Sequence, residues 1–184
     1  MKNEESPWKS LSSEVKYSNP WIEVVEHQVI NPGGGKGIYG KVHFKNIAVG
    51  VIPIDENGNT WIVGQHRFPL DEFSWEIPEG GSPLGEDLVV TAKRELKEET
   101  GLEAETYELI LKMHTSNSVS DEIAFVFLAM GIRQGNSSLE ETESDMQIKK
   151  LTFSSVYEMV MNGEITDSMS VAGILKANAI INQE

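Results

Sequence analysis

Three carboxylates, those of Glu95, Glu98 and Glu99, lie three and four positions apart in one stretch of the chain. In a helix this spacing places them on one stripe, because residues i, i+3 and i+4 are neighbours on the helix surface. Like charges at this spacing repel, and Gly101 is suited to end the helix, so the carboxylates also stand at its negative end. A hard divalent cation explains such a cluster, because it takes oxygen ligands. The spacing therefore predicts a metal site for Mg²⁺ or Mn²⁺.

The apolar residues of the same stretch predict how the helix is held. Val89, Ala92 and Leu96 form a second stripe beside the carboxylates. An apolar stripe of this kind faces the core of a globular protein. The alternative, an acidic helix face that is merely solvated, is typical of looser runs of glutamate.

The complete pattern is longer than the helix. Gly80 is followed after five residues by Glu86, and after seven more by the run Arg94-Glu95-Leu96-Lys97-Glu98-Glu99-Thr100-Gly101-Leu102. The pattern matches in full the signature of the Nudix hydrolases, and the chain resembles that family most specifically here. The resemblance implies metal-assisted hydrolysis of a pyrophosphate in a nucleoside diphosphate that is linked to another moiety.

The resemblance also implies roles for single residues. Three carboxylates and one main-chain carbonyl are expected to bind the metal: Glu95, Glu98, Glu99 and the carbonyl of Glu79, the residue just before the first signature glycine. Glu98 and Glu99 are the two that we expect to be catalytic. Arg94 and Glu86 are expected to form an ion pair that orients the cluster and does not react.

A catalytic base is expected outside the signature. Some similar enzymes take it from a loop further along the chain, and here the acidic stretch with Glu140, Glu141 and Glu143 occupies that place. We favour Glu143, because it stands closest to the strand that follows. The alternative is that all three glutamates only solvate the loop, as charge runs usually do.

The substrate class is indicated by two segments before the signature. Gln65-His66-Arg67-Phe68 and Ser74-Trp75-Glu76-Ile77-Pro78 resemble the ADP-ribose pyrophosphatase and nucleoside diphosphate sugar branch of the family. Arg67 is then expected to bind a phosphate, and Glu76 a sugar or base. Trp75 is expected either to contact substrate or to pack in the core. Trp21 is a candidate to stack on the nucleobase.

The chain departs from that branch at one point. ADP-ribose pyrophosphatases typically carry a proline about 15 residues past the signature, where this chain has Ser116-Asn117-Ser118. Sugar nucleotides such as GDP-mannose or ADP-glucose are therefore expected beside ADP-ribose. The alternatives are a Nudix pyrophosphatase for another nucleoside diphosphate derivative and a non-catalytic sugar-nucleotide sensor, although sensors usually lose the signature glutamates.

Composition narrows the class of protein further. The 184 residues carry a formal net charge of −14 and no cysteine, which argues against a nucleic-acid partner and excludes disulfides and cysteine nucleophiles. The first residues have no apolar signal segment, and no apolar run is long enough to cross a membrane. We therefore expect a cytoplasmic enzyme with a small-molecule nucleotide sugar as substrate and no membrane partner.

The hydrophobic pattern predicts an α/β fold. Residues 1–45 are expected to form an N-terminal extension with a β-hairpin, and residues 46–184 a Nudix α/β/α sandwich with a mixed sheet. Strands are expected at 47–53, 61–65, 107–113, 124–130 and 147–153. Ser155 with Glu158 is expected to cap one helix that ends at Gly163, and Asp167 to cap a last one through Ile181. In the branch that the chain resembles, the hairpin crosses to a second subunit, which implies a homodimer.

Overall fold

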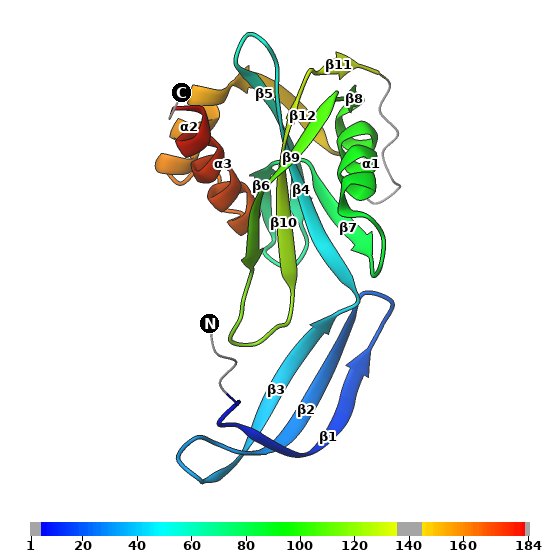
Figure 1. The fold of residues 1–184 in the computed structure, drawn as a ribbon, viewed down its shortest axis with the longest axis vertical. Helices are drawn as coiled ribbons and strands as arrows, with labels where there is room; N and C mark the ends of the chain where they lie inside the picture. The colour runs from blue at the N-terminus through cyan, green and yellow to red at the C-terminus, as the bar shows by residue number, and fades with distance from the viewer. Residues whose placement is uncertain (1–4, 136–144, 183–184) are drawn as a thin grey trace. The chain divides into compact units, whose positions relative to one another are not determined.

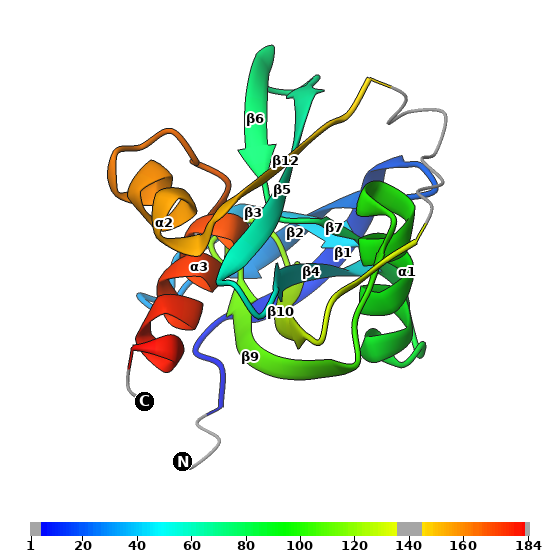
Figure 2. The same ribbon diagram turned by 90° about the horizontal axis from the view of Figure 1, so that it is seen from above.

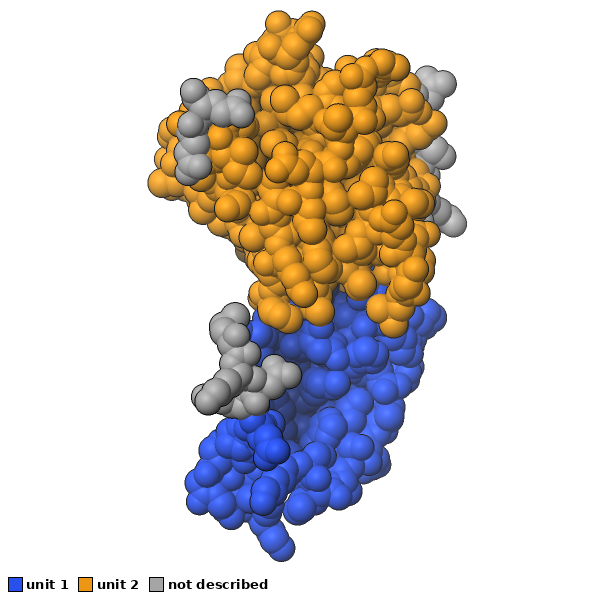
Figure 3. Space-filling model, in the orientation of Figure 1, with its two compact units in different colours: residues 1–46, 116–122 blue, residues 47–115, 123–184 orange. Residues whose placement is uncertain are grey.

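The computed structural model describes residues 5–135 and 145–182. It divides into two compact units (Figure 3). Unit 1 comprises residues 1–46 with 116–122, and unit 2 comprises residues 47–115 with 123–184. The short segment Ser116–Glu122 belongs to unit 1 although it connects two strands of unit 2, which the sequence analysis did not predict.

Unit 1 is an antiparallel sheet of three strands in the order β1-β2-β3 (Figure 1). β2 (Ile22–Ile30) and β3 (Lys36–Phe44) form the predicted hairpin. Its turn is held by Asn31, whose Oδ1 accepts hydrogen bonds from the N–H groups of Gly33 and Gly35, both at 3.0 Å. β1 (Lys9–Ser18) was not predicted, because its serine-rich, fully exposed sequence carries little apolar signal.

The segment Ser116–Glu122 is bound along β3. The N–H of Val42 donates to the carbonyl of Val119 at 2.8 Å, and the N–H of Asp121 donates back to Val42 at 3.1 Å. The Asp121 carboxylate also accepts from Lys41 Nζ at 3.1 Å and lies 2.7 Å from His43 Nδ1. These contacts explain why the segment is part of unit 1.

Unit 2 contains the mixed sheet that the sequence predicts. Its main path runs β12-β5-β4-β10-β9, and only β4 and β10 pair in parallel. The strands of this path are β4 (Asn46–Ile54), β5 (Asn59–Arg67), β9 (Thr106–His114), β10 (Ile123–Met130) and β12 (Gln147–Thr152). Four short strands complete the unit: β6 (Glu72–Glu76), β7 (Glu79–Pro83), β8 (Leu102–Glu103) and β11 (Arg133–Gln134).

Helices cover both faces of this sheet, as Figure 2 shows. α1 (Leu88–Thr100) packs through Ala92 and Leu96 on one core, to which β4 contributes Val49 and Val51. α2 (Phe153–Met161) and α3 (Ser168–Ile181) pack on the other core, which includes Ile52 of β4. Alternate residues of one strand thus face opposite cores, because successive side chains of a strand point to opposite faces. The α/β/α sandwich is confirmed.

The residues that cap the helices can be compared with the predicted caps. Asp87 caps α1, and Gly101 ends it with a positive φ of 72°, as expected for the residue after a helix. Asp167 caps α3, which is also confirmed. The predicted start of the preceding helix is wrong: Thr152 caps α2 by accepting from the N–H of Ser155, so Ser155 lies inside the helix. Within the described residues, none of the helices is long and apolar enough to cross a membrane.

Candidate functional site

The predicted carboxylates lie on α1 with different degrees of burial. Glu95 and Glu99 are turned inward, with 6% and 1% of their surface exposed, whereas the side chain of Glu98 is partly exposed. Glu98 stays within reach of solvent on the same helix stripe. Burial of ionised groups is costly unless charges or hydrogen bonds compensate it. The cost of burying the Glu95 and Glu99 carboxylates therefore depends on the charges and hydrogen-bond donors that surround them.

The start of β7 lies directly against both buried carboxylates. The N–H of Glu79 donates to Oε2 of Glu99 at 3.0 Å. Gly80 lies so close to Glu95 that a Cβ at this position would stand 2.2 Å from the carboxylate carbon. Only glycine leaves room for that carboxylate. The first glycine of the signature is therefore required by the space that Glu95 occupies.

Arg94 holds the outer side of the cluster. Its Nη2 lies 2.7 Å from a carboxylate oxygen of Glu95, and its Nη1 donates to Glu98 at 2.9 Å. Nη2 also donates to the carbonyl of Gly81 at 3.0 Å. Desolvation lowers the pKa of Arg94, but the carboxylates of Glu95 and Glu98 outweigh it and leave the pKa raised. Arg94 is charged and fixes the two glutamates relative to β7.

The predicted ion pair between Arg94 and Glu86 is wrong. Glu86 instead accepts a hydrogen bond from the hydroxyl of Thr91, one turn into the helix. The Thr91 hydroxyl also lies 2.8 Å from that of Ser82 on β7. Arg94 pairs with two nearer carboxylates on its own helix. The more distant Glu86 instead stabilises the turn into α1.

A second group of charges surrounds the Glu79 side chain. Arg67 donates from Nε to Glu76 at 2.9 Å, and its Nη2 contacts both Glu76 and Oε1 of Glu79, the latter at 3.2 Å. Burial raises the pKa of Glu79 well above its ordinary value, Asp167 and Glu76 raise it further, and Arg67 opposes them. Oε2 of Glu79 is buried without a hydrogen-bond partner. The side chain is thus part of the site and not only the carbonyl.

α3 contributes a residue whose role at the site the sequence analysis missed. Asp167, predicted only as a helix cap, accepts from the N–H of Ser170 at 2.8 Å and acts electrostatically on Glu79 and Arg67. The buried Ser170 hydroxyl in turn accepts from the N–H of Ile77 at 2.9 Å. No local pattern connects position 167 with position 79, so only the packing of α3 on the sheet places Asp167 there.

The two predicted tryptophans belong to different units of the structure. Trp75 packs against the core beside Phe73, with ring centres 5.1 Å apart, and Lys149 Nζ stands 3.9 Å from the centre of its ring. Trp21 belongs to unit 1 and is 66% exposed. The structure thus gives Trp75 the core packing that the sequence left open. Contact of either ring with a substrate stays a prediction.

The oxygen donors around Glu95 and Glu99 suit a hard divalent cation in chemistry. They are carboxylates, and Oε2 of Glu79 is a further buried carboxyl oxygen that accepts no hydrogen bond. Among the side chains that the structure describes, no three His, Asp or Glu residues form a complete metal-binding set. Arg94 contacts two of the predicted ligands. The residues fit the cation by donor type, and its coordination stays a prediction.

The predicted catalytic base cannot be placed. Glu140, Glu141 and Glu143 lie outside the described residues.

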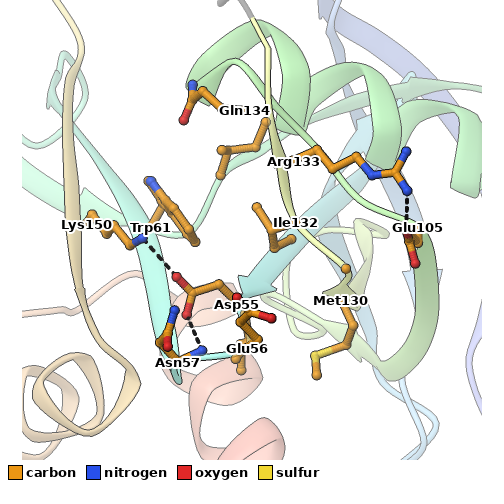
Figure 4. Close-up of a pocket in the computed structure, with 13 residues that line it drawn as sticks. Asp55, Glu56, Asn57, Trp61, Glu105, Met130, Ile132, Arg133, Gln134 and Lys150 are labelled. Carbon is orange, nitrogen blue, oxygen red and sulfur yellow. Dashed lines mark hydrogen bonds and ion pairs between the residues drawn. The ribbon is translucent and has the colours of Figure 1, made fainter.

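A pocket of about 590 Å³ lies elsewhere in unit 2 (Figure 4). Two ion pairs lie on its rim: Asp55 lies 2.8 Å from Lys150, and Arg133 pairs with Glu105. Of the predicted site residues that the structure describes, none lines this pocket. The pocket is therefore separate from the candidate site at the α1 carboxylates, and its volume alone does not give it a function.

Comparison with known families covers most of the chain. Residues 44–162 match the description "NUDIX domain". Residues 8–42 match "Nucleoside diphosphate sugar hydrolase N-terminal domain". The first match spans the sheet of unit 2, the signature and α2, and the second spans β1, β2 and most of β3.

Relatives match over nearly the whole length. An ADP-ribose pyrophosphatase of Mycobacterium tuberculosis is 34% identical over 96% of this chain and 86% of its own. One of Bacillus subtilis is 30% identical over 90% of each chain. A solved structure described as an ADP compounds hydrolase superposes with a TM-score of 0.86 over 99% of this chain and 98% of its own. Its 14% identity shows a common fold only.

Proposed function

The chain belongs to the Nudix hydrolase family, and from this premise we propose that it hydrolyses the pyrophosphate bond of nucleoside diphosphate sugars with Mg²⁺ or Mn²⁺. The products would be a nucleoside monophosphate and a sugar phosphate, which is the sugar 1-phosphate for ADP-glucose or GDP-mannose and ribose 5-phosphate for ADP-ribose. The observation that carries the proposal is the contact of the Glu79–Gly80 main chain with the buried carboxylates of Glu95 and Glu99. That contact assembles the signature into one site.

The residues of the site have separate proposed tasks. Glu95, Glu98, Glu99 and the carbonyl of Glu79 hold the metal. When bound, the metal would neutralise phosphate charge and lower the pKa of an attacking water. Arg94 keeps Glu95 and Glu98 in place through its two terminal nitrogens.

Substrate contacts are proposed for four residues: Arg67, Trp75, Glu76 and Trp21. Nε and Nη2 of Arg67 are engaged by acidic side chains, which leaves Nη1 as its group for a phosphate oxygen. Glu76 is almost fully buried beneath this guanidinium. This burial leaves little of the Glu76 side chain accessible to a sugar or base.

ADP-ribose and sugar nucleotides of the ADP-glucose or GDP-mannose type are the proposed substrates. Two relatives are named ADP-ribose pyrophosphatases, and the N-terminal match is to nucleoside diphosphate sugar hydrolases. Ser116-Asn117-Ser118, where such pyrophosphatases typically have a proline, lies in unit 1 and supports a broader substrate range.

The test is phosphate release in a coupled phosphatase assay with Mg²⁺. ADP-ribose, ADP-glucose, GDP-mannose, UDP-glucose, ATP and a dinucleoside polyphosphate would be compared, each also with Glu98→Gln. Turnover of sugar nucleotides that is lost in the variant supports the proposal. Turnover of ATP or the polyphosphate alone would replace the substrate class, and binding of sugar nucleotides without turnover would identify a sensor.

Glu143 is the proposed catalytic base. We expect Glu143→Gln to lower kcat by at least tenfold, because general-base catalysis typically contributes about 10²–10⁴-fold. Glu140→Gln and Glu141→Gln are the matched controls, and we expect both to stay near the wild-type rate. Steady-state kinetics at saturating Mg²⁺ compare the three variants. A larger loss in either control than in Glu143→Gln would move the base to that residue.

A homodimer is proposed from unit 1. Unit 1 exposes large apolar side chains that so small a unit cannot bury by itself: Trp8, Leu11, Val15, Tyr17, Trp21 and Ile38. A second copy of the chain would cover them. Light scattering on the purified protein is expected to give twice the chain mass of 20.4 kDa. A protein that stays monomeric under all conditions of the activity assay would contradict the proposed homodimer.

A further inference from the structure

Three contacts connect the β5–β6 hairpin with α1 through the main chain that begins β7, and Figure 1 shows these elements. Glu76 at the end of β6 binds Arg67 at the end of β5. Arg67 contacts the Glu79 side chain at 3.2 Å, and the Glu79 N–H reaches Glu99 at 3.0 Å. The side chains of Glu76, Arg67 and Glu79 thus contact one another in sequence. The main chain of Glu79 then contacts Glu99, a proposed metal ligand.

Glu76 fixes the orientation of the Arg67 guanidinium independently of its contact with Glu79. Glu76 accepts from Nε at 2.9 and 3.0 Å and also from Nη2, and only 4% of its side chain is exposed. A fork of this kind gives a defined direction, because both groups are planar. A lysine would keep the positive charge but could not hold both Glu76 and Glu79 in this geometry.

Arg67 also balances the negative charge that surrounds Glu79. Glu76, Asp167 and Glu99 all act on Glu79 with the same sign, and Arg67 is the cation that opposes them. If the guanidinium moves away, the Glu79 side chain loses its 3.2 Å contact with Arg67 and with it the group that fixes its position. Because side chain and main chain move together at one residue, the Glu79 N–H and carbonyl would shift with it.

We propose that Arg67 is a positioning residue. Glu76 holds its guanidinium, and the guanidinium contacts the Glu79 side chain. Arg67 thereby fixes the Glu79 main chain against Glu99 and determines the geometry of the metal site. This role is additional to any phosphate contact through Nη1. It rests on the proposed function, because it requires a divalent cation at the α1 carboxylates. Residues that support metal ligands in this way typically change metal affinity by about 10–100-fold when they are replaced.

The decisive measurement is Mn²⁺ binding by isothermal titration calorimetry in the absence of substrate. We expect Arg67→Lys to weaken Mn²⁺ binding by about 10–100-fold. The matched control is Arg133→Lys, the same change in an ion pair in which the Arg133 side chain is 73% exposed, and we expect no change there. Saturating Mn²⁺ is expected to restore most of kcat/KM for Arg67→Lys, because the loss lies in metal binding.

Two further variants test the route through Glu79. Glu79→Ala keeps the main-chain N–H and carbonyl but removes the group that Arg67 grips, and we expect it to weaken Mn²⁺ binding as Arg67→Lys does. The double variant is expected to bind Mn²⁺ no worse than either single variant, because both act on one contact. If Arg67→Lys does not fold, Glu79→Ala alone carries the test.

The opposing outcomes are distinct. Unchanged Mn²⁺ affinity in Arg67→Lys and Glu79→Ala, with a KM for substrate that Mn²⁺ does not rescue, would make Arg67 a substrate ligand only and overturn the proposal. Wild-type protein that binds no Mn²⁺ at all would instead refute the metal-dependent function on which the proposal rests. Additive losses in the double variant would show that Arg67 does not act through Glu79.

Discussion

Glu99→Gln is expected to lower kcat by at least about 100-fold, because a bound metal stabilises the charge of the transition state by several kcal/mol. Glutamine is close in size and keeps an oxygen to accept from the Glu79 N–H, which lies 3.0 Å away. The fold should therefore survive while the charge is lost. Steady-state kinetics measure the first effect, and thermal unfolding followed by circular dichroism the second.

The same variant has an expected effect on stability that separates a functional from a structural role. Glu99 is 1% exposed and lies close to Glu79, so its ionised form is costly without metal. In EDTA we expect Glu99→Gln to be at least as stable as the wild type, and we expect Mn²⁺ to stabilise only the wild type strongly. The exposed Glu108 on β9 offers a matched control as Glu108→Gln. Full activity in Glu99→Gln would remove Glu99 from the metal site.

Gly80→Ala is expected to reduce kcat/KM by at least about 100-fold with a smaller effect on folding. The added Cβ would stand 2.2 Å from the carboxylate carbon of Glu95, so that carboxylate must move. It is the end of a flexible side chain, and overpacking of this kind costs about 1–3 kcal/mol. The displaced carboxylate no longer holds its place in the site, and about 3 kcal/mol of lost metal stabilisation corresponds to the expected rate.

The control for this prediction is Gly40→Ala in β3. A Cβ at Gly40 meets no atom within 4 Å, so we expect neither stability nor activity to change greatly. Urea unfolding and kinetics would be run on both variants. Normal activity in Gly80→Ala would mean that Glu95 can leave its position without loss, and Glu95 would then not be a metal ligand.

The helix that carries the chemistry was predictable because its determinants are local. The i, i+3, i+4 spacing places Glu95, Glu98 and Glu99 on one stripe whatever the rest of the fold does. Gly101 ends the helix, and Leu96 packs on the core, as the sequence predicted. The mixed sheet was predicted from strands that lie before and after the signature helix in the sequence.

The errors arose where several partners of equal type were available. Arg94 was expected to pair with Glu86, but it pairs with Glu95 and Glu98 on its own helix. Thr152 and Ser155 both have a hydroxyl suited to the N-cap position, and Thr152 is the one that caps α2. Local sequence cannot choose between such partners, since the choice depends on distances of a few ångströms in the folded chain.

By itself, the sequence determined the family, the α/β/α fold and the helix that presents the proposed metal ligands. Only the tertiary structure decided what surrounds them: Gly80 against Glu95, Arg67 between Glu76 and Glu79, and Asp167 of α3 beside this group. The physical reason is range. Periodicity along the chain fixes neighbours within two helix turns, whereas the contact of Arg67 with Glu79 and the electrostatic effect of Asp167 on both exist only after the sheet and the helices have packed.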